Sequence, residues 1–334
     1  MLNYSKIMFF MIMILGTTLT MSAETWLGMW MGLELNMVSF IPLIYSEKMK
    51  TTHESCMIYF LIQSMGSIIM LFSILINPSL MNSPYVGEEV FSIVISMSML
   101  IKMGAPPFHF WFPEIAEKMT WPSCFLLMTW QKIAPMYILS CVIDTSQYLI
   151  YLMIPIMVLT GSIGGLNQTS IRKIMSYSSM DHIGWMIMCM KFYNTMWMFY
   201  FTIYSMILGS IILTFWIHSS FYINQYSSKS LSFTEKISII VLFLSLGGLP
   251  PFLGFLPKFI VIQLMIVSES YGMAVILVIT TLITLFYYLR LISSILLINT
   301  STVKWASQES MNNAPMSLIM AVNLLFPVIA MFWL

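Results

Sequence analysis

Long apolar stretches separated by short polar segments run along the whole chain. An α-helix needs about 20 apolar residues to cross a bilayer, and a window of that size finds about eleven such stretches. They lie near residues 5–22, 25–45, 56–76, 89–112, 122–143, 148–170, 173–190, 196–219, 236–267, 272–298 and 314–334. The pattern predicts an all-α integral membrane fold of about eleven transmembrane helices, in one polytopic membrane domain over residues 1–334.

Two of these stretches contain paired prolines in the middle of the span. The segment MGAPPFHFWFP at 103–113 aligns without gaps on GGLPPFLGFLP at 247–257, a constant shift of 144 residues. Adjacent prolines remove backbone donors and clash with the preceding turn, so each helix is expected to break there. Discontinuous helices are therefore predicted near 103–113 and 247–257.

The two predicted breaks lie five crossings apart. An odd number of crossings reverses the direction of the chain through the membrane, so the repeats are expected to have inverted topology. That arrangement marks ion and substrate sites in secondary transporters. Broken backbone at membrane depth is also tolerated only where protein or a water-filled cavity satisfies it, so we expect the functional residues beside the breaks.

Charged residues outside the spans or at their ends are distributed unevenly between the two sides. Nine basic residues fall on the side of the N-terminus: Lys6, Lys48, Lys50, Lys118, Arg172, Lys173, Lys229, Lys236 and Lys304. The opposite side carries one lysine and five acidic residues: Lys191, Glu24, Glu88, Glu89, Asp144 and Glu269. Because Lys and Arg accumulate on the cytoplasmic side, the N-terminus is expected on that side, which in a mitochondrion is the matrix.

Composition supports the membrane assignment and excludes several other classes of protein. Hydrophobic residues make up 59% of the chain and charged residues 8%, whereas soluble domains are about 25% charged. A net charge of +1 without a basic stripe argues against a nucleic-acid partner. The four cysteines have no CxxC spacing for a metal or a cluster, and no strand, GxGxxG and helix order is present for a dinucleotide. No cofactor is therefore expected on this chain.

Six charged residues remain inside the predicted spans: Glu34, Lys102, Lys132, Asp181, Lys258 and Arg290. Even a lenient insertion scale assigns about 2.5 to 3.5 kcal/mol to Lys, Arg or Asp at a helix centre, so apolar residues would be more stable there. Snorkelling or a structural ion pair is the preferred explanation for Arg290, near a helix end, and an equal alternative for Asp181. We interpret Glu34 and the three lysines as a proton relay.

The sequence also suggests how the lysines are arranged. Glu34 and Lys102 should approach within about 4 to 6 Å, because each charge is costly alone and opposite charges favour both ionised forms. Lys102 ends the half-helix before its break and Lys258 begins the half-helix after its break, so their helix-dipole environments should be opposed. His109, beside the first pair of prolines, could relay protons or cap broken backbone, with equal weight for the two roles.

Five long motifs resemble the antiporter-like membrane subunits of respiratory complex I, including their animal mitochondrial members, and related cation/proton antiporters. They are TWLGMWMGLELNMVSFIPLI (25–44), KMGAPPFHFWFPE (102–114), TWQKIAP (129–135), GGLNQTSIRKIMSYSSMDHIGW (164–185) and LSLGGLPPFLGFLPK (244–258). The likeness covers nearly the whole chain. It implies a fold of membrane helices with a polar path along the bilayer midplane.

The resemblance implies a role for individual residues. Glu34 matches the family's membrane glutamate, and Lys102 matches the lysine at the first helix break. Lys132 matches the central lysine and Lys258 the lysine at the second break. Asp181 departs from the family, in which a neutral residue often precedes the position of His182, so relay roles for Asp181 and His182 stay open.

The resemblance also implies a setting for the chain. It would be a proton-translocating core subunit of NADH:ubiquinone oxidoreductase in the mitochondrial inner membrane, without a redox site of its own. NADH, FMN, iron–sulfur clusters and ubiquinone would be bound by other subunits. The partners would be the other membrane subunits of complex I and membrane lipids.

Two alternatives from other classes share some of these features. An independent cation/proton antiporter should contain its own substrate pocket with carboxylates, whereas Glu34 and Asp181 are the acidic residues inside the predicted spans. A structural membrane scaffold would tolerate neutral residues in place of Lys102, Lys132 and Lys258. The buried charges favour a pump over a scaffold, and the family resemblance favours a complex subunit over an independent antiporter.

Overall fold

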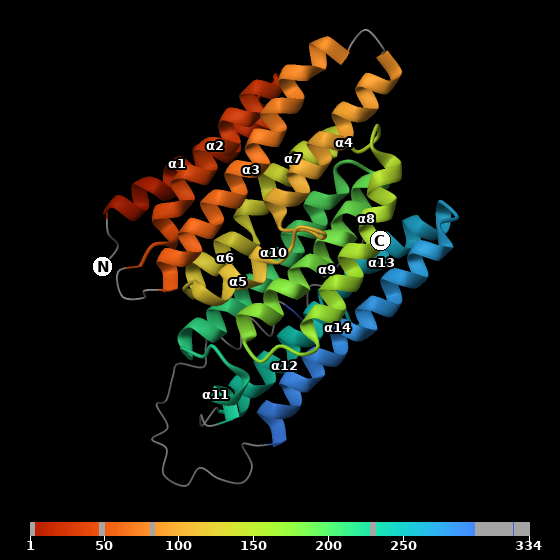
Figure 1. Ribbon diagram of the computed structural model, residues 1–334. Helices are drawn as coiled ribbons and strands as arrows, with labels where there is room; N and C mark the ends of the chain where they lie inside the picture. The colour runs from red at the N-terminus through yellow and green to blue at the C-terminus, as the bar shows by residue number, and fades with distance from the viewer. Residues whose placement is uncertain (1–3, 47–50, 81–83, 228–231, 298–322, 324–334) are drawn as a thin grey trace. The chain divides into compact units, whose positions relative to one another are not determined.

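A computed structural model of the chain is shown in Figure 1. It describes residues 4–46, 51–80, 84–227, 232–297 and 323. Almost all of these residues lie in α-helices, so the predicted all-α class is confirmed. The chain divides into two compact units, Met1–Met157 and Val158–Leu334. Each unit contains one of the two predicted helix breaks.

The described part of the first unit consists of seven helices and the start of an eighth. They are α1 (Tyr4–Ser22), α2 (Trp26–Ile44), α3 (Thr51–Leu80), α4 (Pro84–Met103), α5 (Trp111–Lys118), α6 (Trp121–Met128), α7 (Trp130–Val142) and the first part of α8 (Gln147–Gly165). Helices α1, α2 and α3 run side by side (Figure 1), and α3 and α7 both pack against α4. The helices that carry Glu34, Lys102 and Lys132 therefore belong to one packed group.

The second unit continues from α8 through six further helices in its described residues. They are α9 (Ile171–Phe192), α10 (Met196–Ile217), α11 (Ile223–Ser227), α12 (Phe233–Gly247), α13 (Phe255–Val267) and α14 (Tyr271–Leu297). A capping box between Ser232 and Glu235 begins α12, because each side chain bonds to the other residue's backbone N–H. Helix α9 packs against α10 and α13, and α12 packs against α10 and α14.

The predicted spans correspond closely to these helices. Seven are long and apolar enough to cross a membrane, including α6 and α7 taken together. Three more expected spans coincide with α4, with α9 and with the α12–α13 pair. In these helices, charged residues or the break itself leave a shorter apolar stretch than in the other seven. The last expected span, 314–334, lies outside the described residues apart from Asn323.

Both predicted breaks begin with a glycine in the left-handed region. Helix α4 is followed by Gly104 with φ 68°, and α12 is followed by Gly248 with φ 75°. In each case the glycine N–H bonds to the carbonyl three residues earlier and the next N–H to the carbonyl five residues earlier, which is the Schellman motif. The four distances are Gly104 N to Ile101 O 3.1 Å, Ala105 N to Leu100 O 2.9 Å, Gly248 N to Ser245 O 3.0 Å and Leu249 N to Leu244 O 3.3 Å. The helix ends before the two breaks therefore share one capping conformation.

The repeat extends from the breaks to whole helices. Shifted by 144 residues, α1 to α5 fall close to α8, α9, α10, α12 and α13 in that order. Close helix contacts recur as well. A Cβ on Gly16 of α1 would lie 2.9 Å from the backbone nitrogen of Asn36, and a Cβ on Gly161 of α8 would lie 2.8 Å from that of Asp181. The two units are thus built on one five-helix pattern.

A third break interrupts the span that was expected to be continuous over 122–143. Helix α6 ends at Met128 and α7 begins at Trp130, with Thr129 between them at φ −116° and ψ −77°. The Thr129 hydroxyl bonds to the carbonyl of Phe125 at 2.7 Å, and such local bonds compete with the helical pattern. Neither Gly nor Pro stands at 128–130, so the paired-proline signal of the other breaks is missing here.

Candidate functional site

Lys102 is buried at the end of α4, beside the first break. Its exposed fraction is 6%. Gly66 on α3 leaves room for its aliphatic chain, because a Cβ at that position would lie 2.9 Å from Lys102 Cγ. The path of the side chain is therefore fixed by close packing between α3 and α4.

Glu34 on α2 lies within electrostatic range of Lys102. The two side chains do not form a direct ion pair. Direct ion pairs at 2.9 Å instead join Lys118 to Glu54 and to Glu114. Glu34 and Lys102 thus share an electrostatic environment, and their approach to within about 4 to 6 Å stays a prediction.

A buried polar network lies beside Lys132. This lysine is 1% exposed, and its Nζ is 5.3 Å from the ring centroid of Phe112. The neighbouring Gln131 donates from its amide nitrogen to Asn36 Oδ1 at 3.0 Å, and its Oε1 accepts from the hydroxyl of Tyr59 at 3.1 Å. These bonds join α2, α3 and α7 next to Lys132. The lysine itself lies in the first turn after the third break.

Lys258 lies in the first turn of α13, with an exposed fraction of 5%. Its Nζ donates to the carbonyl oxygens of Leu246 at 3.4 Å and Gly247 at 3.1 Å, which end α12. Carbonyls at a helix C-terminus carry partial negative charge and favour an ammonium. The expectation that Lys258 and Lys102 have opposed dipole environments is therefore wrong. The flexible lysine side chain reaches back across the break from the start of α13 to the end of α12.

Side-chain donors cap equivalent carbonyls at the two breaks. Gln63 on α3 donates from Nε2 to the carbonyl oxygen of Lys102 at 2.9 Å. Shifted by 144 residues, Lys102 corresponds to Leu246, whose carbonyl accepts from Lys258. Carbonyls at a helix end lack intrahelical partners and need an external donor when buried. The first unit supplies an amide for this purpose and the second supplies a titratable ammonium.

Asp181 and His182 are both buried on α9. Asp181 is 1% exposed and lies within electrostatic range of Lys258, and its Oδ1 makes no hydrogen bond in the described part of the chain. His182 Nδ1 lies 2.9 Å from the hydroxyl of Tyr200, and its ring is 4.8 Å from that of Tyr204 between centroids. The structure thus brings Asp181 to Lys258 and directs His182 toward tyrosines of α10.

Two further candidates, His109 and Arg290, lie away from the bonds described above. His109 lies inside the first break, where its ring is 4.3 Å from that of Phe110 between centroids. Arg290 on α14 donates to the carbonyls of Leu166 and, at 2.9 Å, Gln168 in the segment after α8. These bonds support the structural explanation of Arg290, because they satisfy backbone acceptors beyond the end of α8.

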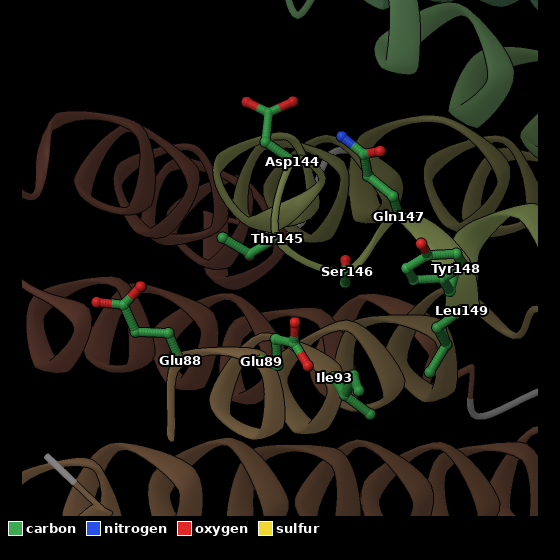
Figure 2. Close-up of a pocket in the computed structure, with 9 residues that line it drawn as sticks. All are labelled: Glu88, Glu89, Ile93, Asp144, Thr145, Ser146, Gln147, Tyr148 and Leu149. Carbon is green, nitrogen blue, oxygen red and sulfur yellow. The ribbon is translucent and has the colours of Figure 1, made fainter. Parts of the chain in front are cut away.

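An acidic pocket of about 350 Å³ lies at the start of α4 and the connection between α7 and α8 (Figure 2). Glu88, Glu89 and Asp144 line it together with Ser146 and Gln147. In Figure 2 the carboxylate of Asp144 points away from those of Glu88 and Glu89, so the three groups do not converge on one point. The pocket gathers three of the acidic residues that sequence analysis placed on the side opposite the N-terminus.

Comparison with known proteins shows the family to which the chain is related. Residues 23–284 match the family model described as NADH:quinone oxidoreductase/Mrp antiporter, TM. The chain is 42% identical to NADH-ubiquinone oxidoreductase chain 2 of Locusta migratoria, over 95% of this chain and 92% of that one. It is also 42% identical to the protein of the same name from Anopheles gambiae, over 96% and 94%. The chain belongs to the NADH-ubiquinone oxidoreductase chain 2 family.

Solved structures with low sequence identity share the fold of this chain 2 family member. A chain of respiratory complex I from Thermus thermophilus with bound aureothin is 19% identical and has a TM-score of 0.78, covering 98% of this chain and 79% of that one. A chain of the Mrp complex from Dietzia sp. DQ12-45-1b is 13% identical with a TM-score of 0.82, covering 97% and 75%. The membrane fold is therefore shared well beyond the range of close sequence similarity.

Four buried polar residues in the first unit of this chain 2 family member were not found from sequence. They are Gln63, Gln131, Asn36 and Tyr59, each 9% exposed or less, and they bond to the backbone of Lys102 or to one another. Amide residues inside an apolar span are costly without partners. That cost was a usable signal, because three of these four residues are amides within predicted membrane helices.

Replacing Gln63 by leucine is expected to destabilise the backbone at the first helix break. The substitution keeps a side chain of similar size but replaces the amide with an apolar group, which leaves the carbonyl of Lys102 without its described donor. An unsatisfied buried acceptor costs about 1 to 3 kcal/mol. The fraction of complex that survives a heat step should therefore fall in the Gln63→Leu variant. Ser64→Ala, which removes a local bond to Leu61 on the same helix, is the control, and equal heat tolerance of the two variants would refute the capping role.

Proposed function

We propose that this chain translocates protons as a membrane subunit of NADH:ubiquinone oxidoreductase, through Glu34, Lys102, Lys132 and Lys258. The observation that carries this proposal is that each of the three lysines is buried within one turn of a helix break. Their exposed fractions are 6%, 1% and 5% in chain order. A charge at such a position is costly, and three buried lysines beside helix breaks are difficult to explain by stability alone.

The helix breaks suit proton transfer for a physical reason. A broken helix leaves backbone N–H and C=O groups without helical partners, and at membrane depth these need protein groups or water. Lys258 already bonds to two such carbonyls, and Gln63 bonds to another at Lys102. A lysine amine beside these groups can accept a proton, hold it as an ammonium close to partial negative charge, and release it when its surroundings change.

The polar residues around Lys132 extend the proposed path within the first unit. Asn36 and Tyr59 form a hydrogen-bonded chain with Gln131, which precedes this lysine in the sequence. Glu34 lies on the same helix as Asn36 and interacts electrostatically with Lys102. His109, Asp181 and His182 are proposed as auxiliary relay groups.

The chemistry that drives the pump is assigned to other subunits. We propose that NADH, FMN, iron–sulfur clusters and ubiquinone are bound there, and that this chain contains no redox site of its own. The relatives' name, NADH-ubiquinone oxidoreductase chain 2, supports membership of such an assembly. The proposed partners are the other membrane subunits of the complex and membrane lipids, with no nucleic acid. The proposed location is the mitochondrial inner membrane, with the N-terminus on the matrix side.

The proposal is tested by neutralising Lys132. In the assembled complex, Lys132→Met should lower the rate of proton pumping by at least about tenfold, because a positioned proton-transfer group typically contributes about 10²- to 10⁴-fold. Lys118→Met is a matched control, because Lys118 forms its ion pairs with partly exposed carboxylates and such pairs contribute about 0 to 1 kcal/mol. If this chain were only a scaffold, the complex would pump equally well with either substitution. If it were an independent antiporter, it would exchange cations without the other subunits.

A further inference from the structure

We propose that Asp181 is the charge partner of Lys258, so that the second unit contains a carboxylate–lysine pair of its own. The proposal rests on the proposed function, because it assumes that the charge of Lys258 changes during pumping. Asp181 then positions the ammonium of Lys258, and its carboxylate loses its charge partner when Lys258 releases a proton. It is a positioning residue for Lys258.

The burial of Asp181 shows that its carboxylate needs a partner. The residue is 1% exposed, and Oδ1 accepts no hydrogen bond from the groups that the structure describes. An isolated ionised carboxylate in an apolar interior costs far more than a hydrogen-bonded one. Lys258 is the oppositely charged group whose field acts on Asp181. An attraction between the two offsets part of the cost of burying both.

The ammonium of Lys258 lies near the part of α9 that carries Asp181. Lys258 Nζ lies 5.8 Å from the ring centroid of Trp185, which follows Asp181 by one helical turn. Helix α13, which carries Lys258, packs directly against α9. Gly248 leaves space for the lysine chain, because a Cβ there would lie 2.7 Å from Lys258 Cδ. The ammonium is thus held between the carbonyls that end α12 and the turn of α9 that carries Asp181.

The internal repeat gives independent support for this pairing. Helix α9 is the repeat counterpart of α2, and shifted by 144 residues Glu34 falls at position 178, within one turn of Asp181. The glycine contacts align Asp181 with Asn36, two residues from Glu34. Each unit therefore has a carboxylate on the same helix of the pattern, within electrostatic range of the lysine beside its break.

The proposed pair gives Lys258 a way to be reloaded with a proton. With Lys258 protonated and Asp181 ionised, the pair has no net charge, because the two opposite charges compensate each other. When Lys258 releases its proton, the carboxylate is left as an uncompensated buried charge, which is unfavourable. The next proton to reach the amine restores the neutral pair. Asp181 thereby favours return of the site to its loaded state after each release.

The test measures proton pumping in the assembled complex for Asp181→Asn, Lys258→Met and the double variant. Asp181→Asn should lower pumping about tenfold while Asp181→Glu retains most of it, because glutamate keeps the charge. The double variant should pump no worse than Lys258→Met alone, since residues that act as a pair are not additive. Glu269→Gln, an exposed carboxylate of the same unit, is the control and should pump normally.

Each other outcome has a defined consequence. Normal pumping by Asp181→Asn together with defective pumping by Lys258→Met would overturn the pair and leave the proposed function intact. Normal pumping by Lys258→Met would instead overturn the function assigned to this lysine. Additive losses in the double variant would place Asp181 in a separate role and overturn the pair. If Asp181→Asn does not assemble, assembly of the double variant supports the pair, because both charges are then removed, and failure of both overturns it.

Discussion

Complexes that carry Lys258→Arg are expected to assemble normally and to pump at least about tenfold more slowly than the unmodified complex. Arginine can still donate to the carbonyls of Leu246 and Gly247 and can still face Asp181. It cannot readily deprotonate, so a step that needs a neutral side chain at this position is blocked. The predicted separation of assembly from pumping is the signature of a group that must change its charge.

Lys258→Met is expected to be defective in both respects. Methionine fills a similar volume but donates no hydrogen bond, so two carbonyls and a buried carboxylate lose their charged partner. Removing one member of a buried pair costs about 3 to 5 kcal/mol, and the amount of assembled complex should fall along with pumping. Native gels and vesicle acidification measure the two quantities separately. Normal pumping by the arginine variant would make Lys258 a fixed structural charge and contradict the release role.

Gly254→Ala is expected to prevent the second break from forming. A Cβ on Gly254 would lie 1.8 Å from the backbone oxygen of Ser245 and 2.8 Å from its carbonyl carbon. Backbone atoms cannot rotate away as a flexible side chain can, so the α12–α13 segment would have to shift. Overpacking in a filled interior costs about 1 to 3 kcal/mol and occasionally more, and a contact this short belongs at the upper end. Since every 1.4 kcal/mol is about tenfold, assembled complex should decrease by at least about tenfold.

Gly272→Ala provides the control for this glycine prediction. Gly272 lies in the first turn of α14, and nothing is found within 4 Å of a Cβ placed on it. Alanine is also the better helix former by about 1 kcal/mol, so this variant should assemble at least as well as the unmodified chain. Steady-state amounts of the chain in native gels measure both variants. Equal amounts for the two variants would show that the Gly254 contact does not restrict the break.

Much of the fold could be predicted from the sequence because two strong local signals were present. Apolar stretches of membrane length fixed where most helices lie, and the paired prolines with a preceding glycine marked two breaks. The break at Thr129 carries neither signal. The Thr129 hydroxyl bonds to the carbonyl of Phe125 there, but Thr280 bonds to the carbonyl of Leu277 inside an unbroken helix. A threonine by itself therefore does not mark a break.

The candidate site could be predicted in part, for a related reason. A charge in an apolar span is conspicuous, so Glu34, Lys102, Lys132 and Lys258 could be identified without a structure. Their neutral partners and the direction of each side chain depend on packing between helices distant in sequence. Lys258 illustrates the limit, because its place at the start of α13 suggested a positive dipole environment. Its four-carbon chain instead carries the ammonium back to the end of α12.

The central claim, that protons cross the membrane through the buried lysines of this chain, is tested most directly by the rate of proton pumping, measured together with NADH oxidation. Complex with Lys132→Met and complex with Lys118→Met would be reconstituted in sealed vesicles, and acidification and NADH oxidation would be recorded together. The account predicts an unchanged ratio and rate for Lys118→Met. For Lys132→Met it predicts that protons pumped per unit time fall by at least about tenfold, with normal assembly on native gels. An assembled Lys132→Met complex that pumps at the control rate and ratio would contradict the account.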